Sequence, residues 1–199
     1  IEELAAKAAP GLTAVFLETP TNPLMTITDI AATAEIAHRY EALLIVDNTF
    51  LTPLRQLPLT EGADIVIHPG TKFLSGHNDI LAGVVVAKTQ TLGERLYFLA
   101  NTSGPTLSSF DTWLFIRSLK TLPLRFEKQE TNAKAIVDYL KDHPLVKDVL
   151  YPEAGAMISI RVHDAEKISA FLRALTVFTF AESLGGVESL ITYPTTQTH

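Results

Sequence analysis

Four short runs of apolar residues, in which apolar and polar side chains do not alternate, constrain the fold of this chain most. The runs lie at residues 13–18, 43–46, 64–68 and 82–87. A strand that is covered on both faces of a sheet shows such a continuous run, whereas a strand with one wet face alternates. Between the first two runs, residues 27–40 carry apolar side chains at the spacing of one helix face, after candidate N-cap residues at 26–29. This order predicts an α/β fold with a mostly parallel sheet.

The second half of the chain has a different pattern. Helices are predicted at 108–120, 125–142 and 164–175, and strands at 146–151, 157–162 and 176–180. The expected buried stripe of the second of these helices consists of Phe126, Ala133, Ile136, Val137 and Leu140. We therefore place a boundary near Leu122–Pro123, with residues 1–122 in a larger domain and residues 123–199 in a smaller α+β domain.

Composition excludes several classes of function. The chain of 199 residues has a formal net charge of −6 and contains no cysteine. Without cysteine there is no disulfide framework, no thiolate nucleophile and no Cys-ligated metal. An acidic chain without a basic block is a poor candidate for binding nucleic acid or an anionic membrane surface. The longest apolar run, Ile80–Ala87, is much shorter than the ~20 residues of a membrane span. We therefore expect a globular, cytoplasmic protein.

Polar side chains follow three of the predicted strands, at the edge of the sheet where α/β proteins bind ligands. Asn22 follows the first strand, Asp47 ends the second, and Lys72 lies shortly after the third. An enzyme that uses pyridoxal phosphate needs a lysine to form a Schiff base with the cofactor and an acid to keep the pyridine nitrogen protonated. Asp47 is also explained as a turn residue and Lys72 as a surface charge, so the spacing alone leaves both interpretations open.

Other catalytic motifs do not fit this region. Gly70-Thr71-Lys72 lacks the Gly-Lys-Ser/Thr order of a P-loop, and Ser75 lacks the flanking glycines of a nucleophile elbow. No metal site is predicted, because the acidic residues and histidines show no metal-ligand spacing. His77 is instead expected to make a structural hydrogen bond within its loop.

The run from His68 to Asp79, HPGTKFLSGHND, resembles the lysine signature of the Cys/Met-metabolism family of pyridoxal phosphate enzymes. Three further segments resemble this family in the same order. They are ETPTNP at 18–23, VDNTF at 46–50 and AESLGGVESL at 181–190. The resemblance runs from end to end of the chain. It implies a fold type I, aspartate-aminotransferase-like transferase, in which residues 1–122 belong to the large cofactor-binding domain and residues 123–199 to the C-terminal domain.

The resemblance also implies roles in binding pyridoxal 5'-phosphate. Lys72 would be the Schiff-base lysine, and Asp47 would hold the pyridine nitrogen. Thr49 would pack beside the ring, and Asn22 would reach the phenolic oxygen of the cofactor or the substrate. Thr71 would donate its hydroxyl to the phosphate.

Two residues near the C-terminus would contact the amino-acid substrate, again by resemblance. Ser183 would help to hold the substrate carboxylate. Glu182 would favour chemistry at the γ-carbon, because its carboxylate could attract the distal amino group of cystathionine or cysteine, although it is also explained as an exposed surface acid. Pro69 departs from the family pattern, because relatives usually have there a serine that reaches the phosphate, and proline has no donor.

The implied function is trans-sulfuration like that of cystathionine γ-synthase or γ-lyase, with cystathionine β-lyase or methionine γ-lyase as the alternative. Family chains are roughly twice this long, so the chain resembles a member truncated at both ends. The resemblance also implies a homotetramer built as a dimer of dimers. Two other classes remain open, a non-catalytic family member that serves as an oligomerisation module and an unrelated α/β nucleotide-binding module.

Overall fold

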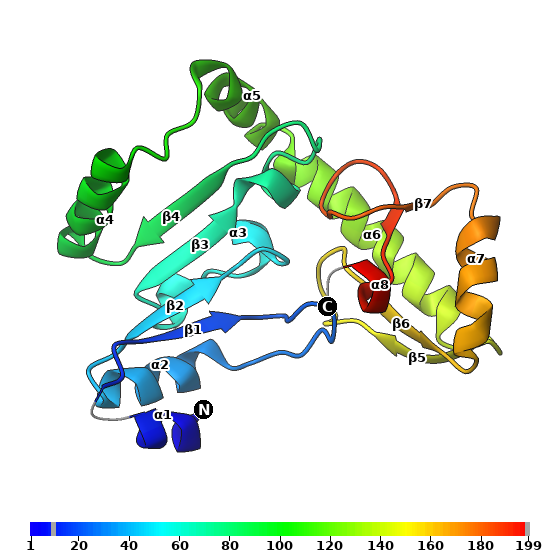
Figure 1. Cartoon of the computed structure of the whole chain (residues 1–199), viewed down its shortest axis with the longest axis horizontal. Coiled ribbons are helices and arrows are strands. Elements are labelled where there is room, and N and C mark those ends of the chain that lie inside the picture. Colours follow the sequence, from blue (N-terminus) through cyan, green and yellow to red (C-terminus); the bar gives the residue numbers. More distant parts are fainter. Residues whose placement is uncertain (9–10, 198–199) are drawn as a thin grey trace.

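The computed structural model describes residues 1–8 and 11–197, and the first half of the chain is built on a four-stranded sheet (Figure 1). The strands, in their spatial order, are β1 (Ala14–Glu18), β2 (Leu43–Asp47), β3 (Ile65–Pro69) and β4 (Gly83–Ala87). The first three run parallel, and β4 is antiparallel to β3. The predicted α/β fold with a mostly parallel sheet is therefore confirmed.

Helix α2 (Ile30–Arg39) covers one face of this sheet. Asp29 is its N-cap, and the Asp29 Oδ1 accepts a hydrogen bond from the Ala32 amide at 2.9 Å, within the predicted cap segment. The apolar stripe of α2 packs against alternate residues of the strands, among them the fully buried Leu44 and Val46. Helix α1 (Glu2–Ala8) lies beside α2 on the same side of the sheet (Figure 1).

The opposite face of the sheet is exposed mainly on its two edge strands, β1 and β4, among the described residues. Phe16 of β1 is 62% exposed and Val85 of β4 is 51% exposed, although both are large and apolar. The expectation of a sheet covered on both faces therefore holds only in part for the described residues, because Ile65 of the central strand β3 is buried on this same face. The apolar runs are present as predicted, but β4 in particular has no helix packed over all of its length, so its side chains remain largely exposed.

Further helical segments lie between β2 and β3 and after β4 (Figure 1). They are α3 (Thr52–Arg55), a 3₁₀ turn (Pro58–Glu61), α4 (Gln90–Ser103), α5 (Ser109–Leu119) and α6 (Leu122–Leu140). Sequence analysis predicted α5 and α6 but not α4. Leu92, Leu96 and Leu99 lie at helical spacing in α4, but none of the residues of this helix is buried, so they pack into no core of the described residues. The predicted boundary near Leu122–Pro123 falls at the start of α6, and the division into two domains stays a prediction.

The C-terminal part contains two small sheets. Strands β5 (Val146–Leu150) and β6 (Ser159–Val162) are antiparallel, and β7 (Thr179–Phe180) and β8 (Leu190–Ile191) are parallel. The predicted helix at 164–175 is divided into a 3₁₀ turn (Ala165–Lys167) and α7 (Ile168–Ala174), and a short α8 (Pro194–Gln197) follows β8. The strand expected at 176–180 has only two residues, and β8 was not expected. Within the described residues, no helix is long and apolar enough to cross a membrane.

A second core lies beneath the turn that follows β3. Phe73 and Leu74 of this turn pack with Phe115 of α5 and Phe126 of α6. The rings of Phe73 and Phe126 meet edge to face with their centroids 5.3 Å apart, a favourable geometry for aromatic pairs. Because Phe73 follows Lys72 directly, this core fixes the backbone next to the predicted Schiff-base lysine.

Candidate active site

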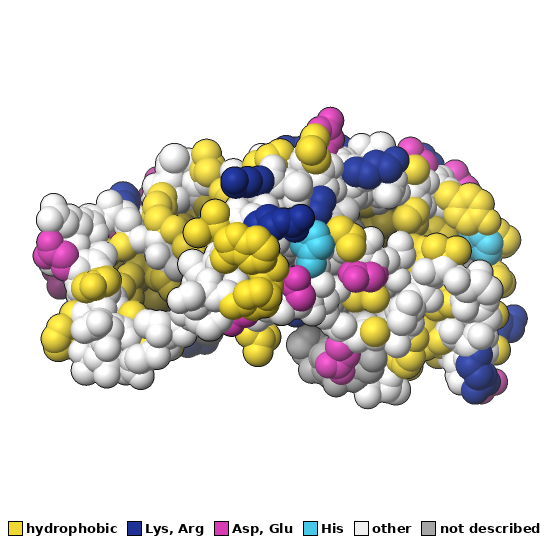
Figure 2. All heavy atoms as spheres, turned by 90° about the horizontal axis from the view of Figure 1, so that it is seen from above, with side chains coloured by type: hydrophobic (Ala, Val, Ile, Leu, Met, Phe, Trp, Pro, Cys, Tyr) yellow, Lys and Arg dark blue, Asp and Glu magenta, His cyan; other side chains and the backbone are white. Residues whose placement is uncertain are grey.

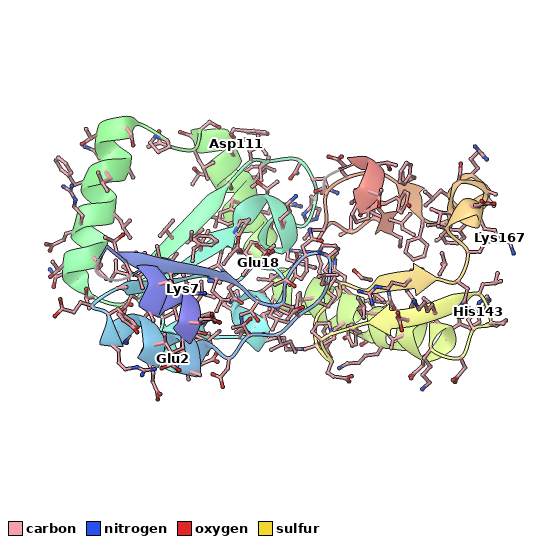
Figure 3. All side chains as sticks on the ribbon, turned by 60° about the horizontal axis from the view of Figure 1, so that its bottom comes forward. Glu2, Lys7, Glu18, Asp111, His143 and Lys167 are labelled. Atoms are coloured by element: carbon pink, nitrogen blue, oxygen red, sulfur yellow. The ribbon has the colours of Figure 1, made fainter. Side chains whose placement is uncertain are left out.

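The carboxyl ends of β1, β2 and β3 meet at one edge of the sheet, as parallel strands require. Glu18 ends β1 and pairs in register with Asp47, which ends β2. Glu18 lies toward the middle of the molecule, on the side of the sheet edge that faces β5 and β6 (Figure 3). The loop after β1 and the Lys72 turn after β3 leave the sheet at the same edge. The predicted residues therefore gather where an open α/β sheet binds ligands.

Asp47 and Thr49 form a local turn. The Asp47 Oδ1 accepts a hydrogen bond from the Thr49 amide at 3.0 Å and a second one from the Thr49 hydroxyl. Through its Oδ1, Asp47 therefore acts as the turn residue of the alternative interpretation. No hydrogen bond to Oδ2 is found among residues 1–8 and 11–197. One carboxylate oxygen is therefore oriented by the turn, and the other remains able to accept a proton-bearing nitrogen.

Lys72 lies in a π-type turn, Gly70–Leu74, and not in a regular helix. Its backbone angles, φ −90° and ψ −127°, differ from those of its helical neighbours and turn its side chain out of the helical path. The Lys72 Nζ donates to the Ser183 hydroxyl at 3.4 Å. Lys72 is half-buried and makes no ion pair within the described part of the chain. Its amine is therefore not neutralised by a carboxylate.

A chain of hydrogen bonds continues from Ser183. The Ser183 hydroxyl donates to the Asn78 Oδ1 at 3.2 Å, and the Asn78 Nδ2 donates to the Glu188 carboxylate at 2.7 Å. Ser183 has φ +94°, which a non-glycine residue adopts only when its surroundings impose it. Sequence analysis missed Asn78 and Glu188 as individual residues, although both lie in the two segments that carry the family resemblance.

Close backbone approach joins the loop of Ser183 to the Lys72 turn. Gly185 has φ +80°, and a Cβ added to it would lie 2.5 Å from the Phe73 amide nitrogen. No side chain fits there, because real Cβ atoms do not approach so closely. The glycine therefore allows two segments more than a hundred residues apart to form opposite walls of one site.

The two walls enclose an open cleft of about 560 Å³. Its lining includes Thr71, Asn78, Glu182, Ser183 and Glu188. Glu182 is exposed beside Ser183, so its predicted position near the substrate-binding serine is compatible with the structure. The Thr71 Oγ1 accepts a hydrogen bond from the Ala82 amide at 3.0 Å, which holds the side chain at the wall of the cleft.

Within the described residues, Asp47 and Thr49 form side-chain hydrogen bonds only with each other and do not line the cleft, and Asn22 is the predicted site residue with the fewest connections. It is exposed in the loop after β1, and no hydrogen bond to its side chain is found in the described part of the chain. Its contact with cofactor or substrate stays a prediction. Pro69 ends β3 immediately before the turn and offers no donor there.

The two histidines of this region are structural. The His77 Nδ1–H donates to the Ser75 carbonyl at 2.5 Å, so the expected hydrogen bond within the loop is confirmed. His68 is buried, and burial lowers its pKa, so it is neutral near pH 7. Its buried Nδ1 has no hydrogen-bond partner among the described residues.

Comparisons with known proteins identify the family of this chain. The sequence profile of the Cys/Met metabolism PLP-dependent enzymes matches residues 1–199. The chain is 50% identical over 196 residues to a cystathionine gamma-synthase of Haemophilus influenzae, and 45% identical over an alignment of 214 residues to a cystathionine gamma-lyase of Bacillus subtilis. These matches cover 98% and 100% of this chain.

Solved structures show the same fold. The crystal structure of cystathionine gamma-lyase from Lactobacillus plantarum complexed with L-serine has a TM-score of 0.94 and 42% identity, over 98% of this chain and 56% of that one. The chain spans about half the length of the curated relatives it matches, 53% of the Haemophilus protein and 56% of the Bacillus protein. With a profile match over all of its residues, the chain belongs to the Cys/Met metabolism PLP-dependent enzyme family.

Proposed function

We propose that this chain carries part of the active site of a pyridoxal-phosphate-dependent enzyme that acts at the γ-carbon of amino acids, as cystathionine γ-synthase or γ-lyase does. The observation that carries the proposal is the contact of the Lys72 Nζ with the Ser183 hydroxyl at the border of the cleft, which Ser183 and the exposed Glu182 line. This contact brings together the lysine and the substrate-binding serine that the resemblance assigns.

The residues present fit the cofactor. Lys72 has an amine without an acidic partner, so it is available to bind an aldehyde. Asp47 has one carboxylate oxygen fixed by Thr49 and a second without a hydrogen bond among the described residues, as a partner of a protonated ring nitrogen requires. Thr71 lines the cleft, and its hydroxyl, which donates to the Ala82 carbonyl at 3.4 Å, would turn from that carbonyl to reach the phosphate. Pyridoxal phosphate bound there would supply an electron sink for a substrate carbanion.

Each side chain has a definite task in this proposal. Lys72 would hold the cofactor, and its Nζ, when the substrate amine takes its place, would accept the α-proton and deliver it to another carbon. Asp47 keeps the ring nitrogen protonated. Ser183 would bind the substrate carboxylate by turning its hydroxyl, which donates to the Asn78 Oδ1 in this structure, toward the substrate. Glu182 attracts the second ammonium group of a substrate such as cystathionine, which supports the γ-carbon assignment.

Borohydride reduction in the presence of pyridoxal phosphate, followed by peptide mapping, tests cofactor binding. We expect modification confined to Lys72, and none in a Lys72→Ala variant. Lys88 is exposed, and its side chain makes no hydrogen bond or ion pair in the described part of the chain, so Lys88→Ala is the matched control and should leave the modification unchanged. Labelling spread over many lysines would contradict an organised cofactor site.

Substrate assays on the complete protein that carries this sequence test the reaction. We expect turnover of an O-acyl-homoserine with cysteine, or release of an oxoacid from cystathionine by γ-elimination. Glu182→Gln keeps the size of the side chain and removes its charge, so it should raise KM for cystathionine more than it changes kcat. Activity in β-elimination alone would exclude the γ-carbon assignment and favour a cystathionine β-lyase.

A homo-oligomer is part of the same proposal, and one surface supports it. Large apolar side chains are exposed along α4 and α5, where a single soluble chain rarely leaves so many uncovered. They are Tyr97, Phe98, Phe110, Trp113 and Ile116. Figure 2 looks onto the side of the molecule where α5 lies and shows hydrophobic side chains gathered there. Sedimentation should show association, and Trp113→Glu should weaken it, whereas a monomer at all concentrations would contradict this.

The same surface favours a second candidate function, an oligomerisation module without catalysis. A protein of this kind would associate through α4 and α5 but show no selective modification of Lys72. The two measurements above separate the candidates, because association alone supports the module and selective labelling supports the enzyme. The cytoplasmic location stays a prediction from the sequence.

A further inference from the structure

The turn that carries Lys72 satisfies only part of its own backbone. The Gly70 carbonyl accepts from the Ser75 amide at 2.9 Å, and the Lys72 carbonyl accepts from the Gly76 amide at 2.8 Å. The Thr71 carbonyl accepts from the Ser75 hydroxyl at 3.2 Å. These bonds account for the first three carbonyls of the turn. The next two carbonyls are those of Phe73 and Leu74, which are both buried. A buried carbonyl without a hydrogen-bond partner destabilises the folded state.

Arg125, in the first turn of α6, supplies the missing donors. Its Nη1 donates to the Phe73 carbonyl at 2.9 Å and its Nη2 to the Leu74 carbonyl at 3.2 Å. The same Nη2 donates to the Ser118 carbonyl at the C-terminal end of α5 at 3.1 Å, and the Nε donates to the Thr121 hydroxyl at 3.0 Å. One planar guanidinium thus connects the Lys72 turn to α5 and α6.

The surroundings of Arg125 are specialised for this contact. Gly76 has φ +66°, and a Cβ there would lie 1.9 Å from the Arg125 Nη1, so only glycine allows the guanidinium to reach the turn. Arg125 makes no ion pair with a carboxylate within the described residues, and burial lowers its pKa from the ordinary value. A partly buried cation that bonds only neutral oxygens is unusual, because its desolvation is not offset by an opposite charge. Its contacts are therefore specific to the shape of this turn.

We propose that Arg125 is a positioning residue for Lys72, which holds the non-helical backbone of the turn so that the lysine amine faces Ser183. The proposal rests on the proposed function. Arg125 acts through the carbonyls of Phe73 and Leu74 and does not contact the reacting atoms. A lysine at this position carries the same charge but lacks the planar guanidinium with its several N–H donors, so it can bond fewer of these carbonyls at once.

The test compares Arg125→Ala and Arg125→Lys with the wild-type protein. Arg161→Lys is the matched control, because Arg161 is exposed on β6 and pairs with Asp148. Borohydride trapping of pyridoxal phosphate gives the ratio of labelled Lys72 to labelled Lys88, which is normalised to the folded fraction. Amide hydrogen exchange at Ser75 and Gly76 reports on the turn without any cofactor.

We expect the labelling ratio to fall at least about tenfold in Arg125→Ala, because a misplaced amine reacts more slowly with the cofactor. The fall should be smaller in Arg125→Lys. Exchange at Ser75 and Gly76 should accelerate in both variants while the sheet stays protected. A ratio within about twofold of wild type with unchanged exchange would overturn the proposal. Global unfolding of Arg125→Lys would also overturn it, because a role confined to one turn leaves the remaining fold intact.

Different results would overturn the proposed function and the positioning role of Arg125. If the wild-type protein itself shows no selective labelling of Lys72, the proposed function is wrong, whereas the exchange at Ser75 and Gly76 still decides whether Arg125 holds the turn. If the wild type is labelled selectively and the variants behave like it, the proposed function stands and the inference about Arg125 is wrong.

Discussion

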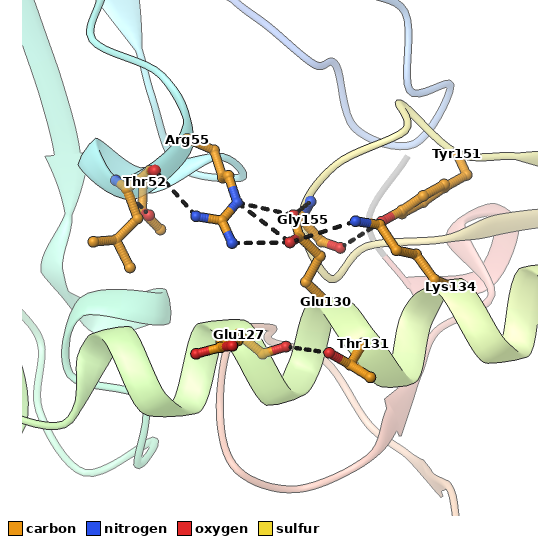
Figure 4. A network of polar contacts seen from close by, with 9 residues as sticks. Thr52, Arg55, Glu127, Glu130, Thr131, Lys134, Tyr151 and Gly155 are labelled. Atoms are coloured by element: carbon orange, nitrogen blue, oxygen red, sulfur yellow. Dashed lines mark hydrogen bonds and ion pairs between the residues drawn. The ribbon is translucent and has the colours of Figure 1, made fainter.

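Replacing Glu130 by glutamine tests how α6 is attached to the rest of the molecule. Glu130 is buried in the middle of α6 and accepts hydrogen bonds from the Arg55 Nε at 3.1 Å and the Arg55 Nη2 at 2.9 Å (Figure 4). It also accepts one from the Gly155 amide at 2.8 Å, and Lys134 lies 3.6 Å away on the same helix. The carboxylate therefore joins α3, α6 and the turn between β5 and β6.

The magnitude follows from the pKa of Glu130. Its hydrogen bonds with Arg55 lower this pKa from 4.5 to about 2, against the opposing effect of burial, and the Gly155 amide adds to the lowering. A difference of this size corresponds to roughly 3 kcal/mol in favour of the charged form. The Arg55 side chain is 37% exposed, and solvent screening reduces the value, so we expect about 1–3 kcal/mol.

The sign of the pH dependence is fixed by the direction of this change. Glu130 titrates near 4.5 in the unfolded chain and near 2 in the folded protein, so it contributes its full stabilisation above pH 4.5 and loses it as the pH falls toward 2. Glu130→Gln should therefore destabilise the protein at pH 7, and the difference from wild type should shrink below pH 4.5. Burial of His68 lowers its pKa, so the free energy of unfolding also falls as the pH drops below about 6.5. This effect is the same in the wild type and in Glu130→Gln, and it cancels when the two are compared.

Urea unfolding followed by circular dichroism at several pH values measures the effect. Asp138→Asn is the matched control, because Asp138 is 73% exposed and pairs with Lys141 only at the surface, where removal costs less than about 1 kcal/mol. If Glu130→Gln lowers the free energy of unfolding by no more than Asp138→Asn does, the carboxylate of Glu130 does not stabilise the fold as we infer. A difference from wild type that stays constant between pH 5 and pH 2 would contradict the same inference.

Three further substitutions test individual contacts. Phe126→Ala empties the core beneath the Lys72 turn, where the ring meets Phe73, and should cost about 3–5 kcal/mol in urea unfolding. Gly185→Ala places a methyl group against the Phe73 amide at a residue with φ +80°, so it should lower the free energy of unfolding by about 1–3 kcal/mol. It should also reduce labelling of Lys72 by pyridoxal phosphate, and unchanged labelling would contradict the close approach. Tyr151→Phe removes the 2.9 Å bond to the Gly155 carbonyl and should cost about 1 kcal/mol. Burial raises the pKa of Tyr151 to about 12, so an ultraviolet titration should show one tyrosine that ionises above its ordinary value of 10.

The fold was predictable where side-chain periodicity reports burial. Strands β1 to β3 and helix α2 were found within three residues of their bounds, because their apolar residues face a core within the chain. Helix α4 was missed although Leu92, Leu96 and Leu99 lie at helical spacing, and all of its side chains remain at least partly exposed. In α6, the predicted stripe contained Phe126 and Ala133 but omitted Glu130, since a buried charge has no signature in an apolar pattern.

The site was predictable only as single residues of distinctive chemistry. Lys72 and Asp47 stood out because each follows an apolar strand, and the family resemblance added Ser183. The Asn78–Glu188 bond spans 110 residues, and Arg125 reaches the carbonyl of a residue 52 positions earlier in the chain. Such contacts depend on how the chain returns to the sheet edge, which no local pattern encodes.

Helix α6 determines how the two walls of the cleft stay aligned. Arg125 donates to the turn of Lys72, and one helical turn later the Gln129 Nε2 donates to the Gly186 carbonyl at 2.8 Å. Residues four positions apart lie on the same face of a helix, so this face contacts both the Lys72 turn and the loop of Ser183. Because both walls are attached to one rigid element, a displacement of α6 moves them together and preserves the distance between the lysine amine and the serine hydroxyl. Loss of one attachment, in contrast, shifts one wall relative to the other. We therefore expect Gln129→Ala to reduce selective labelling of Lys72 while changing the stability of the protein by only about 1 kcal/mol.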